Sequence, residues 1–515
     1  MNVVKEDDQL GDTRTKNTSR NILAGLWNRF STILLSFVNR TIIIYILGAE
    51  FSGLNSLFIS ILGVLNIAEL GIDTAIVQSM YKPIAEGNKK RICELLTIYR
   101  KSYHIVGMII LGVGLLLIPF IPSLINEELP VGVNIYVLYI LYLLNSVISY
   151  FLFAYRESLL YAHQRDDISQ IFRTNLLIGK NVAQAIVLLV FKQYYVYLII
   201  EILFTVLTNL WIGKVTQERY PEYQCVRGEK VRMSDDIKNQ LKGLVIGNVC
   251  DKARNSLDSI ILSAYLGLTV VAIYNNYYYI YSALYGVMLT VCDAMSASVG
   301  NSIVTETVEK NYDNLQKFSF MIAWISGWCA ICMLCLYQPF MKLWMGEELM
   351  LSNYNIMLFC VYFYAINMNN IRNQFVLGTG IWWKLKYSNI AEAIGNTVLN
   401  LVLGKLFGIT GILWATIITI VVFNFLWRTI ILFKNYFSGM NLKLFLRNHC
   451  YWIVCILIAA GVTWNLTRLI NTNTLVTLIV NGVICVFVPN LILLVLFFKT
   501  EQFQNTKQFV KNMLK

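Results

Sequence analysis

The sequence carries little charge for its length. Only 14% of its 515 residues are Asp, Glu, Lys or Arg, whereas 57% are hydrophobic. A soluble protein of this size needs a charge-rich surface to remain in water, so the composition excludes a soluble globular protein. The chain therefore belongs in a lipid bilayer.

Residues typical of catalysis and of metal binding are also scarce. The chain has three histidines, and none of them accompanies a cysteine or serine motif for nucleophilic catalysis. No G-x-x-x-x-G-K-[ST] loop is present to bind ATP. Cys329, Cys332 and Cys335 share one expected helix but are joined by no His or carboxylate, which favours small apolar packing over a metal site. We predict no metal and no cofactor.

Long loops outside the membrane are missing as well. By our spans no outward loop exceeds about 15 residues, whereas a membrane glycosyltransferase or polymerase usually needs a sizeable extramembrane segment for its sugar chemistry. The short loops predict that the protein is not an enzyme. They favour a transporter that is driven by an ion gradient or by downstream consumption of its substrate.

Apolar runs are what the sequence has in abundance. Runs of about 20 residues, enough to cross roughly 30 Å of hydrocarbon, recur from residue 20 almost to the C-terminus. We count about fourteen, at residues 20–47, 52–80, 102–122, 132–155, 170–191, 195–213, 241–267, 270–302, 318–339, 352–371, 388–407, 411–433, 449–469 and 475–498. The first 18 residues lack the apolar core of a signal peptide, so the first helix is expected to stay attached. The sequence predicts an all-α polytopic membrane protein.

The basic residues fall mainly in alternate loops. If the N-terminus is inside the cell, the expected cytoplasmic segments hold about 32 of the 42 Lys and Arg residues, and the opposite loops hold about four. The positive-inside rule then predicts that both termini are cytoplasmic. Basic loops beside anionic headgroups explain the net charge of +12, and no nucleic-acid-binding motif accompanies it. We expect membrane lipids, and no nucleic acid, as partners of these loops.

The chain repeats itself at an offset of 218 to 219 residues. "RNILAGL" at residue 20 resembles "KNQLKGL" at 238, and "YILGAEFSGLNSLFISI" at 45 resembles "AYLGLTVVAIYNNYYYI" at 264. An even number of helices in each half implies a parallel pseudo-twofold repeat of two six-helix lobes around a central cavity. The predicted organisation is a cytoplasmic tail (1–19), an N-lobe (20–213), a cytoplasmic linker (214–240), a C-lobe (241–433), two further helices (449–498) and a cytoplasmic C-terminal tail (499–515).

The first ninety residues or so, from "SRNILAGLWNRF" through "YILGAEFSGLNSLFISILGVLNIAELGIDTAIVQSMY", resemble the opening of the polysaccharide-transport flippases. These O-antigen and capsule repeat-unit flippases belong to the multidrug/oligosaccharidyl-lipid/polysaccharide exporter superfamily. The resemblance implies alternating-access transport of undecaprenyl-pyrophosphate-linked oligosaccharide repeat units from the cytoplasmic to the outer leaflet of the bacterial cytoplasmic membrane. Such transport serves O-antigen, capsule or teichuronic acid biosynthesis, with H⁺ or Na⁺ as a counter-ion.

Two members of the same superfamily remain as alternatives. An ion-coupled multidrug exporter would be expected to present mainly carboxylates to cationic drugs, whereas the first helix of this chain carries arginines. A flippase for lipid II, the peptidoglycan precursor, is not excluded by a cationic cavity. A purely structural scaffold would not need charges inside the membrane.

Two arginines lie inside the first expected helix. Arg29 and Arg40, each preceded by asparagine, are eleven residues apart, which places both on one helix face about 16 Å apart. A charge at the centre of a membrane helix costs about 2.5 to 3.5 kcal/mol, so two on one stripe are not expected to face lipid. They snorkel or form structural salt bridges, or they bind a pyrophosphate or an acidic sugar, whose oxygens match the arginine fork.

The second expected helix also carries a polar stripe. Asn55, Asn66 and Asp73 follow one another at spacings of eleven and seven residues, and Glu69 lies one turn from Asp73. We expect the asparagines to line the cavity. The two carboxylates are candidates for ion coupling or gating, because neighbouring carboxylates can share a proton or a cation. Asp73 has the alternative role of capping or pairing near the helix end.

The corresponding helix of the second half is rich in tyrosine. Tyr281 and Tyr285 lie deep within "YNNYYYIYSALY", and we expect them to contact sugars, because a tyrosine ring stacks on a sugar's C–H face while its hydroxyl forms hydrogen bonds. Tyr274 and Tyr278 lie nearer the helix end, where tyrosines also form an interfacial belt.

Other charged residues fall within expected helices. In "GNVCDKARNSLDSI", Arg254 is spaced to pair with Asp251 or Asp258, so mutual neutralisation competes with a role in the cavity. We expect Lys180 to line the cavity and Asp258 and Asp293 to take part in ion coupling or gating. Further buried candidates are Glu201, Glu392 and Arg428.

Overall fold

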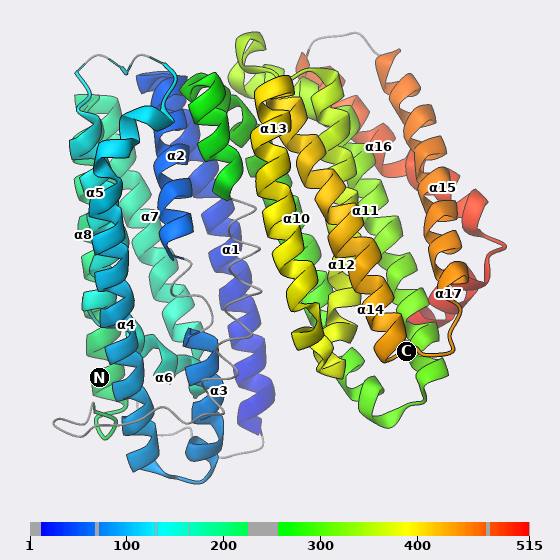
Figure 1. Ribbon diagram of the computed structural model, residues 1–515, viewed down its shortest axis with the longest axis horizontal. Helices are drawn as coiled ribbons and strands as arrows, with labels where there is room; N and C mark the ends of the chain where they lie inside the picture. Colours follow the sequence, from blue (N-terminus) through cyan, green and yellow to red (C-terminus); the bar gives the residue numbers. More distant parts are fainter. Residues whose placement is uncertain are drawn as a thin grey trace. The chain divides into compact units, whose positions relative to one another are not determined.

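A computed structural model describes residues 12–66, 72–127, 129–130, 132–163, 165–224, 256–469 and 474–513. In these ranges the regular structure is entirely helical (Figure 1), so the all-α prediction is confirmed. The chain forms two compact units, Met1–Thr269 and Val270–Lys515.

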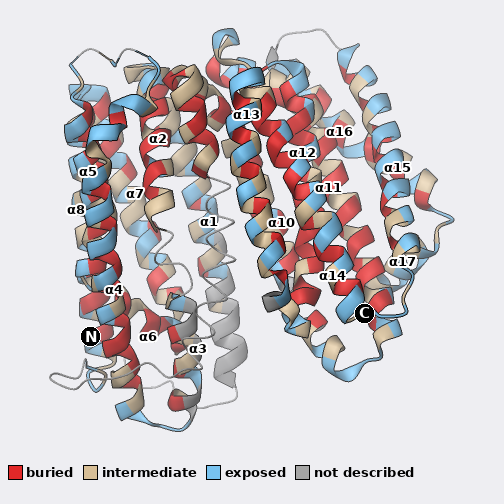
Figure 2. Ribbon diagram, viewed as in Figure 1, coloured by how far each residue is buried: buried red, intermediate tan, exposed pale blue. Residues whose placement is uncertain are grey.

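The first unit is a bundle of long helices whose buried faces form one apolar core (Figure 2). Side-chain caps start several of its helices: Asn88 accepts a hydrogen bond from the Arg91 amide, and Asn134 accepts from the Tyr136 and Val137 amides. The helices are α1 (Asp12–Leu47), α2 (Ala49–Leu65), α3 (Ile72–Ala85), α4 (Lys89–Leu117), η2 (Ile118–Leu124), α5 (Ile135–Phe151), η3 (Ala154–Arg156), α6 (Glu157–Ala162), α7 (Asp166–Phe191) and α8 (Tyr194–Arg219), together with the helix Ser256–Leu266.

The expected span 52–80 holds two described helices. α2 ends at Leu65 with Asn66 as its C-cap, and α3 is described from Ile72; residues 67–71 lie outside the described residues. Asn55 and Asp73 therefore lie on separately described helices, and the common stripe of Asn55, Asn66 and Asp73 stays a prediction. An apolar run of helical period does not reveal where a helix ends when no proline marks the end.

The second unit contains the remaining long helices. Its α12 starts at the Ser352 cap, which accepts from the Asn355 amide, and ends at Gly380 in a left-handed conformation. The elements are α10 (Leu268–Thr305), α11 (Val308–Met345), η4 (Glu347–Leu349), α12 (Asn353–Thr379), η5 (Ile381–Leu385), α13 (Lys386–Thr419), the π-helix η6 (Ile420–Trp427), α14 (Arg428–Asn435), α15 (Leu442–Arg468), α16 (Thr474–Phe497) and α17 (Glu501–Met513).

A turn at a glycine divides α13 into two helical segments. Gly408 has a φ of 59° and a ψ of −133°, which is not helical. The Asn396 side-chain amide donates to the Thr416 hydroxyl at 3.3 Å, although twenty residues of straight helix would span about 30 Å. The chain therefore folds back at Gly408. A Cβ at Gly411 would lie 1.9 Å from the Leu403 carbonyl oxygen, so only glycine fits there.

The C-terminal segment, expected as a tail, forms the amphipathic helix α17 against α11. The Phe503 ring stacks on Trp324 with centroids 5.9 Å apart, and Phe509 meets Phe318 edge-on at 5.7 Å. These aromatic contacts leave Phe503 and Phe509 half-buried and hold α17 against α11 within the second unit.

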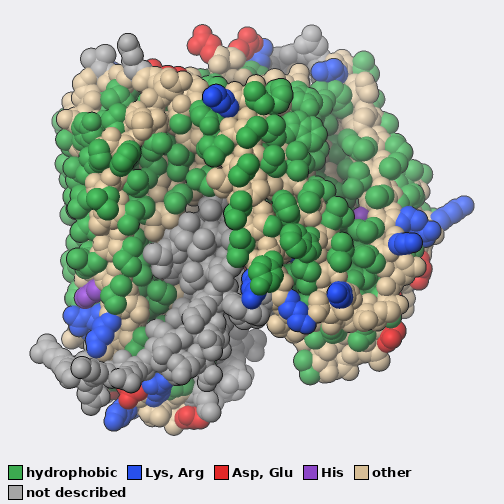
Figure 3. All heavy atoms as spheres, in the orientation of Figure 1, with side chains coloured by type: hydrophobic (Ala, Val, Ile, Leu, Met, Phe, Trp, Pro, Cys, Tyr) green, Lys and Arg blue, Asp and Glu red, His purple; other side chains and the backbone are tan. Residues whose placement is uncertain are grey.

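The helices are long and apolar enough for a multi-pass membrane protein. Of the described residues, eight helices meet the length and composition of a membrane span, and nine if the bent pair Ile135–Phe151 and Ala154–Ala162 is one span. Hydrophobic side chains cover much of the described helical surface in the face shown in Figure 3. Each of the fourteen predicted spans contains a described helix or part of one, while the count of fourteen crossings stays a prediction.

Candidate functional site

The two asparagines of α1 join this helix to the rest of the first unit. Asn28 donates to the Thr174 hydroxyl of α7 at 2.8 Å. Eleven residues later, the Asn39 side chain is buried, and its amide nitrogen lies within hydrogen-bonding distance of three acceptors. These are the side-chain oxygens of Asn181 (3.0 Å), Gln184 (3.1 Å) and Tyr197 (3.1 Å). The asparagines thus fix the face of α1 that packs on α7.

The arginines lie on the neighbouring face of α1, because consecutive residues of a helix are 100° apart. Arg29 is exposed, and within the described residues no hydrogen bond or ion pair involves its side chain. Arg40 is half-buried and has an interaction partner. The two were expected on one face, and the continuous helix α1 keeps them there.

Lys180 belongs to a polar network rather than to an open surface. Its ammonium lies 2.7 Å from the Glu201 carboxylate of α8. Gln184 donates to the other Glu201 oxygen at 2.8 Å, and the same glutamine accepts from Asn39. The network therefore connects α1, α7 and α8, and it gives Lys180 a structural partner within the unit.

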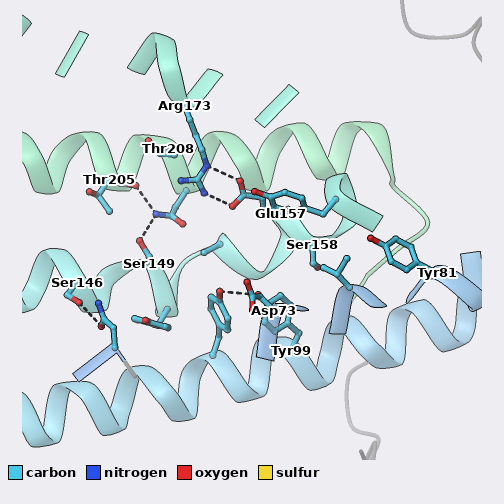
Figure 4. Close-up of a pocket in the computed structure, with 17 residues that line it drawn as sticks. Asp73, Tyr81, Tyr99, Ser146, Ser149, Glu157, Ser158, Arg173, Thr205 and Thr208 are labelled. Carbon is cyan, nitrogen blue, oxygen red and sulfur yellow. Dashed lines mark hydrogen bonds and ion pairs between the residues drawn. The ribbon is translucent and has the colours of Figure 1, made fainter. Parts of the chain in front are cut away.

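A polar cavity of about 840 Å³ lies within the first unit, with α3 and α6 among the helices that line it (Figure 4). Five tyrosines and seven hydroxyl or amide side chains line it. The tyrosines are Tyr81, Tyr99, Tyr103, Tyr150 and Tyr161; the others are Asn66, Ser146, Ser149, Ser158, Thr205, Thr208 and Asn209.

Pairs of polar residues one helical turn apart build the wall between α5 and α8. The Thr205 hydroxyl donates to Asn145 at 2.8 Å, and the Asn209 amide donates to the Ser149 hydroxyl at 3.0 Å. Ser146 in turn donates to Asn66 at 3.0 Å. These bonds satisfy buried polar groups and hold the remaining hydroxyl and amide groups toward the cavity (Figure 4).

The charged residues of the cavity are Asp73, Glu157 and Arg173. The Arg173 guanidinium forms an ion pair with Glu157 and donates from Nε at 2.8 Å, and Ser169 also donates to this carboxylate. Asp73 on α3 is exposed. Because Glu157 and Arg173 neutralise each other, the lining carries one net negative charge.

The other residues predicted on the second helix are placed differently. Asn55 is half-buried and accepts a hydrogen bond from the Tyr142 hydroxyl at 2.6 Å. Asn66 lines the polar cavity together with Asp73, although the two belong to different elements. Glu69, Asp251 and Arg254 lie outside the described residues.

The tyrosine-rich helix α10 packs into the core of the second unit. The Tyr281 ring is 2% exposed and stacks on Tyr362 of α12 with centroids 4.6 Å apart. Tyr285 is half-buried, stacks on Tyr281 at 6.1 Å and donates to Asn370 at 3.4 Å. In this conformation Tyr281 has no free ring face for a ligand, whereas Tyr285 keeps part of its surface.

The acidic residues Asp258 and Asp293 differ in burial. Asp258 is buried in the helix Ser256–Leu266 and has an interaction partner. Asp293, on α10, is exposed and accepts from Gln374 at 3.3 Å.

A buried ionic network crosses the second unit. Arg428 donates to Glu392 at 2.6 Å, and Asn424 donates to the same carboxylate at 3.3 Å. Arg372, 1% exposed, donates to Asn424 at 2.9 Å and to the Phe425 carbonyl within the π-helix at 2.9 Å. The Phe425 carbonyl also accepts from the Arg428 backbone N–H and from the Thr429 hydroxyl, so Arg372 adds a further donor to this turn of the π-helix.

Several of these residues escaped the sequence analysis. Glu157 lies between the expected spans 132–155 and 170–191, and Arg173 lies at the start of the second, where a charge is expected to face the cytoplasm. The wall residues Thr205 and Asn209, and Asn145 and Ser149, are each four residues apart on apolar helices. That spacing places each pair on one face and is the signal that would have predicted the wall.

Comparison with known proteins identifies a family and a fold. The family model described as "Polysaccharide biosynthesis protein" matches residues 16–296, more than half of the chain. No protein of curated function matches the sequence.

The fold resembles those of solved transporters. A lipid II flippase MurJ in an inward closed conformation has a TM-score of 0.68 at 14% identity, covering 92% of this chain and 99% of that chain. An inward-facing multidrug resistance MATE family transporter of the MOP superfamily has a TM-score of 0.63 at 15% identity, covering 80% and 96%. A MOP superfamily transporter from Pyrococcus furiosus has a TM-score of 0.53 at 14% identity, covering 82% and 96%. At these identities the likeness shows the fold alone.

Proposed function

The chain belongs to the polysaccharide biosynthesis protein family and is a membrane transporter of that family, and from this premise we propose that it is a flippase for lipid-linked oligosaccharides. The proposed substrate is an undecaprenyl-pyrophosphate-linked repeat unit, moved by alternating access from the cytoplasmic to the outer leaflet of the bacterial cytoplasmic membrane. The product serves O-antigen, capsule or teichuronic acid assembly.

The polar cavity of the first unit carries this proposal. Its five tyrosines and seven hydroxyl or amide side chains suit a ligand with many hydroxyl groups. Its volume of about 840 Å³ is within the range of small-molecule sites. A net negative charge does not suit a pyrophosphate, so the cavity is assigned to the sugar part of the substrate.

The anionic part of the substrate is assigned to α1. Arg29 and Arg40 are proposed to hold the pyrophosphate or an acidic sugar while the polyprenyl tail stays in lipid. One arginine would act nearer the cytoplasmic mouth of the transporter and the other nearer its outer mouth. The exposure of Arg29, without a described partner, supports this role. The pairing of Lys180 with Glu201 argues for a supporting role of that lysine, which keeps α7 and α8 together behind α1.

Ion coupling is assigned to carboxylates. Asp73 lines the same cavity as the Glu157–Arg173 ion pair and is the proposed site for H⁺ or Na⁺, with Glu69 nearby in sequence. Asp258 and Asp293 are proposed to act in gating. A proton or sodium ion bound at Asp73 would remove the net charge of the cavity while the sugar occupies it.

Deletion of the gene in its host tests the proposed substrate. We expect an oligosaccharide on undecaprenyl pyrophosphate to accumulate in the cytoplasmic leaflet, measured by lipid extraction and mass spectrometry, and the wild-type gene to reverse it. Accumulation of lipid II instead identifies a lipid II flippase. Unchanged lipid-linked saccharides together with new sensitivity to cationic drugs identify a multidrug exporter.

A further inference from the structure

A second polar cavity lies at one end of the second unit. It has a volume of about 500 Å³ and is formed where α17, which packs on α11, begins beside the first turns of α15; we call it the α17 groove. Its lining is Tyr312, Asp313, Gln316, Lys317, Leu444, Arg447, Asn448, Tyr451, Thr500, Glu501, Gln502 and Asn505. The start of α11, the start of α15 and the end of α16 meet at this place.

The α17 groove carries two positive and two negative side chains. These are Lys317 and Arg447, and Asp313 and Glu501. None of the four forms an ion pair with another residue that the structure describes. Opposite charges therefore line one groove without neutralising each other in contact, and their sum is zero.

The wall and floor of the groove are held by other contacts. Stacking of Phe503 on Trp324 fixes the start of α17. Asn448 donates to Gln316 at 2.9 Å, and Gln316 donates to the Tyr312 hydroxyl at 2.9 Å. These bonds join α11 to α15 within the groove, so hydrogen bonds between helices hold part of its lining in place.

The length of α15 bears on the depth of the groove. The 27 residues of α15 span about 40 Å, whereas the hydrocarbon core is about 30 Å thick. The α15 residues that line the groove, Leu444 to Tyr451, belong to its first three turns. If α15 crosses the bilayer, its first turns, and the groove with them, are expected at the edge of the hydrocarbon, the depth of lipid headgroups.

We propose that the α17 groove binds the phosphoethanolamine headgroup of a membrane lipid. Lys317 and Arg447 take the phosphate, and Asp313 and Glu501 take the ammonium group through charge-assisted hydrogen bonds. A lining of zero net charge matches a zwitterion and leaves no charge uncompensated. An anionic headgroup would leave both carboxylates opposite a negative ligand, and a choline headgroup has no N–H to donate to them.

Binding of short-chain lipids to the purified full-length protein tests the proposal. Phosphatidylethanolamine, phosphatidylcholine and phosphatidylglycerol with the same acyl chains are titrated, and the apparent Kd is measured by native mass spectrometry. We expect phosphatidylethanolamine to bind about tenfold more tightly than phosphatidylcholine, which corresponds to the charge-assisted bonds to the two carboxylates.

Variants locate the preference in the groove. The double change Asp313→Asn and Glu501→Gln is expected to remove the ethanolamine preference while the affinity for phosphatidylcholine is kept. Arg447→Gln is expected to weaken both lipids. Glu348→Gln, an exposed carboxylate just beyond the other end of α11, is the matched control and should change nothing. Equal affinity for the two zwitterionic lipids, tighter binding of phosphatidylglycerol, or a preference that survives the double change overturns the proposal.

Discussion

Asn28 and Asn39 have the same eleven-residue spacing as the arginines that follow them, but they perform a different task. Their amides bond to α7 and so decide which face of α1 is turned inward. The sequence predicted the common face of the arginines, because spacing alone determines it. It did not predict the role of the asparagines, because the local sequence around an amide in an apolar helix does not show which residue of another helix it hydrogen-bonds.

Removal of the Asn39 amide is expected to destabilise the first unit. Asn39→Leu leaves buried acceptors on Asn181 and Gln184 without one of their donors, at a cost of about 1 to 3 kcal/mol. The midpoint of thermal unfolding of the purified protein should fall. Asn28→Ala is the comparison and should lower the midpoint less, because Asn28 is half-buried and makes one such bond. Equal midpoints for wild type and Asn39→Leu would contradict the role given to this residue.

Replacement of the α1 arginines distinguishes the effect of their positive charge on flipping from the effect of the guanidinium geometry. Arg29→Lys keeps the positive charge but loses the planar fork, so it should retain partial flipping, whereas Arg29→Ala and Arg40→Ala should lose most of it. Flipping is measured in cells lacking the native gene, at matched protein abundance in the membrane. If both alanine variants flip the saccharide at wild-type rates, the arginines are structural.

Ion coupling by the α3 carboxylate makes a further prediction at this scale. In a Glu69→Gln, Asp73→Asn double variant, transport should lose its dependence on pH or on sodium, because neither position can then bind a proton or a cation. Initial transport rates across a pH series, with and without sodium, measure this. Full retention of both dependences would exclude these residues as the coupling site.

At the scale of the helices, the sequence predicts the long apolar helices well, but it predicts only some of the places where a helix ends. Long apolar runs locate α1, α7, α8 and α15, because a helix in contact with lipid needs apolar side chains over about 20 residues. The turn at Gly408 falls between the expected spans 388–407 and 411–433, whereas the end of α2 at Leu65 falls inside the span 52–80. The docking of α17 depends on tertiary contacts of Phe503 and Phe509, which no local pattern reports.

The π-helix and its ionic network make a prediction for the second unit. Glu392→Leu should remove the only carboxylate hydrogen-bonded to Arg428 among the described residues and leave a buried cation uncompensated, at a cost of about 3 to 5 kcal/mol. The yield of folded protein and its thermal midpoint should both fall. Glu348→Gln, which alters an exposed carboxylate, should leave both unchanged. A Glu392→Leu protein as stable as wild type would show that the network contributes no net stability.

For the whole molecule, the distribution of basic residues predicts that both termini and the connector 214–240 are cytoplasmic. Cysteine accessibility in intact cells measures the sidedness. A cysteine introduced in the connector should react only after permeabilisation, and one at Glu348 should react in intact cells. Labelling of the connector from outside would contradict the predicted topology.

The turn at Gly408 has a consequence for sidedness that extends beyond its own hairpin. Each crossing of a bilayer moves the chain to the other side of the membrane. A turn that divides one long helix into two crossings therefore reverses the side on which every later segment lies. Without that turn, the 50 residues from Lys386 to Asn435 would form one helix of about 75 Å, more than twice the thickness of the hydrocarbon. Crossing once instead of twice, it would invert α15 and α16 in the membrane and place α17 on the side opposite the α11 residues that line the α17 groove. One glycine with a positive φ thereby determines the orientation across the membrane of all helices that follow it.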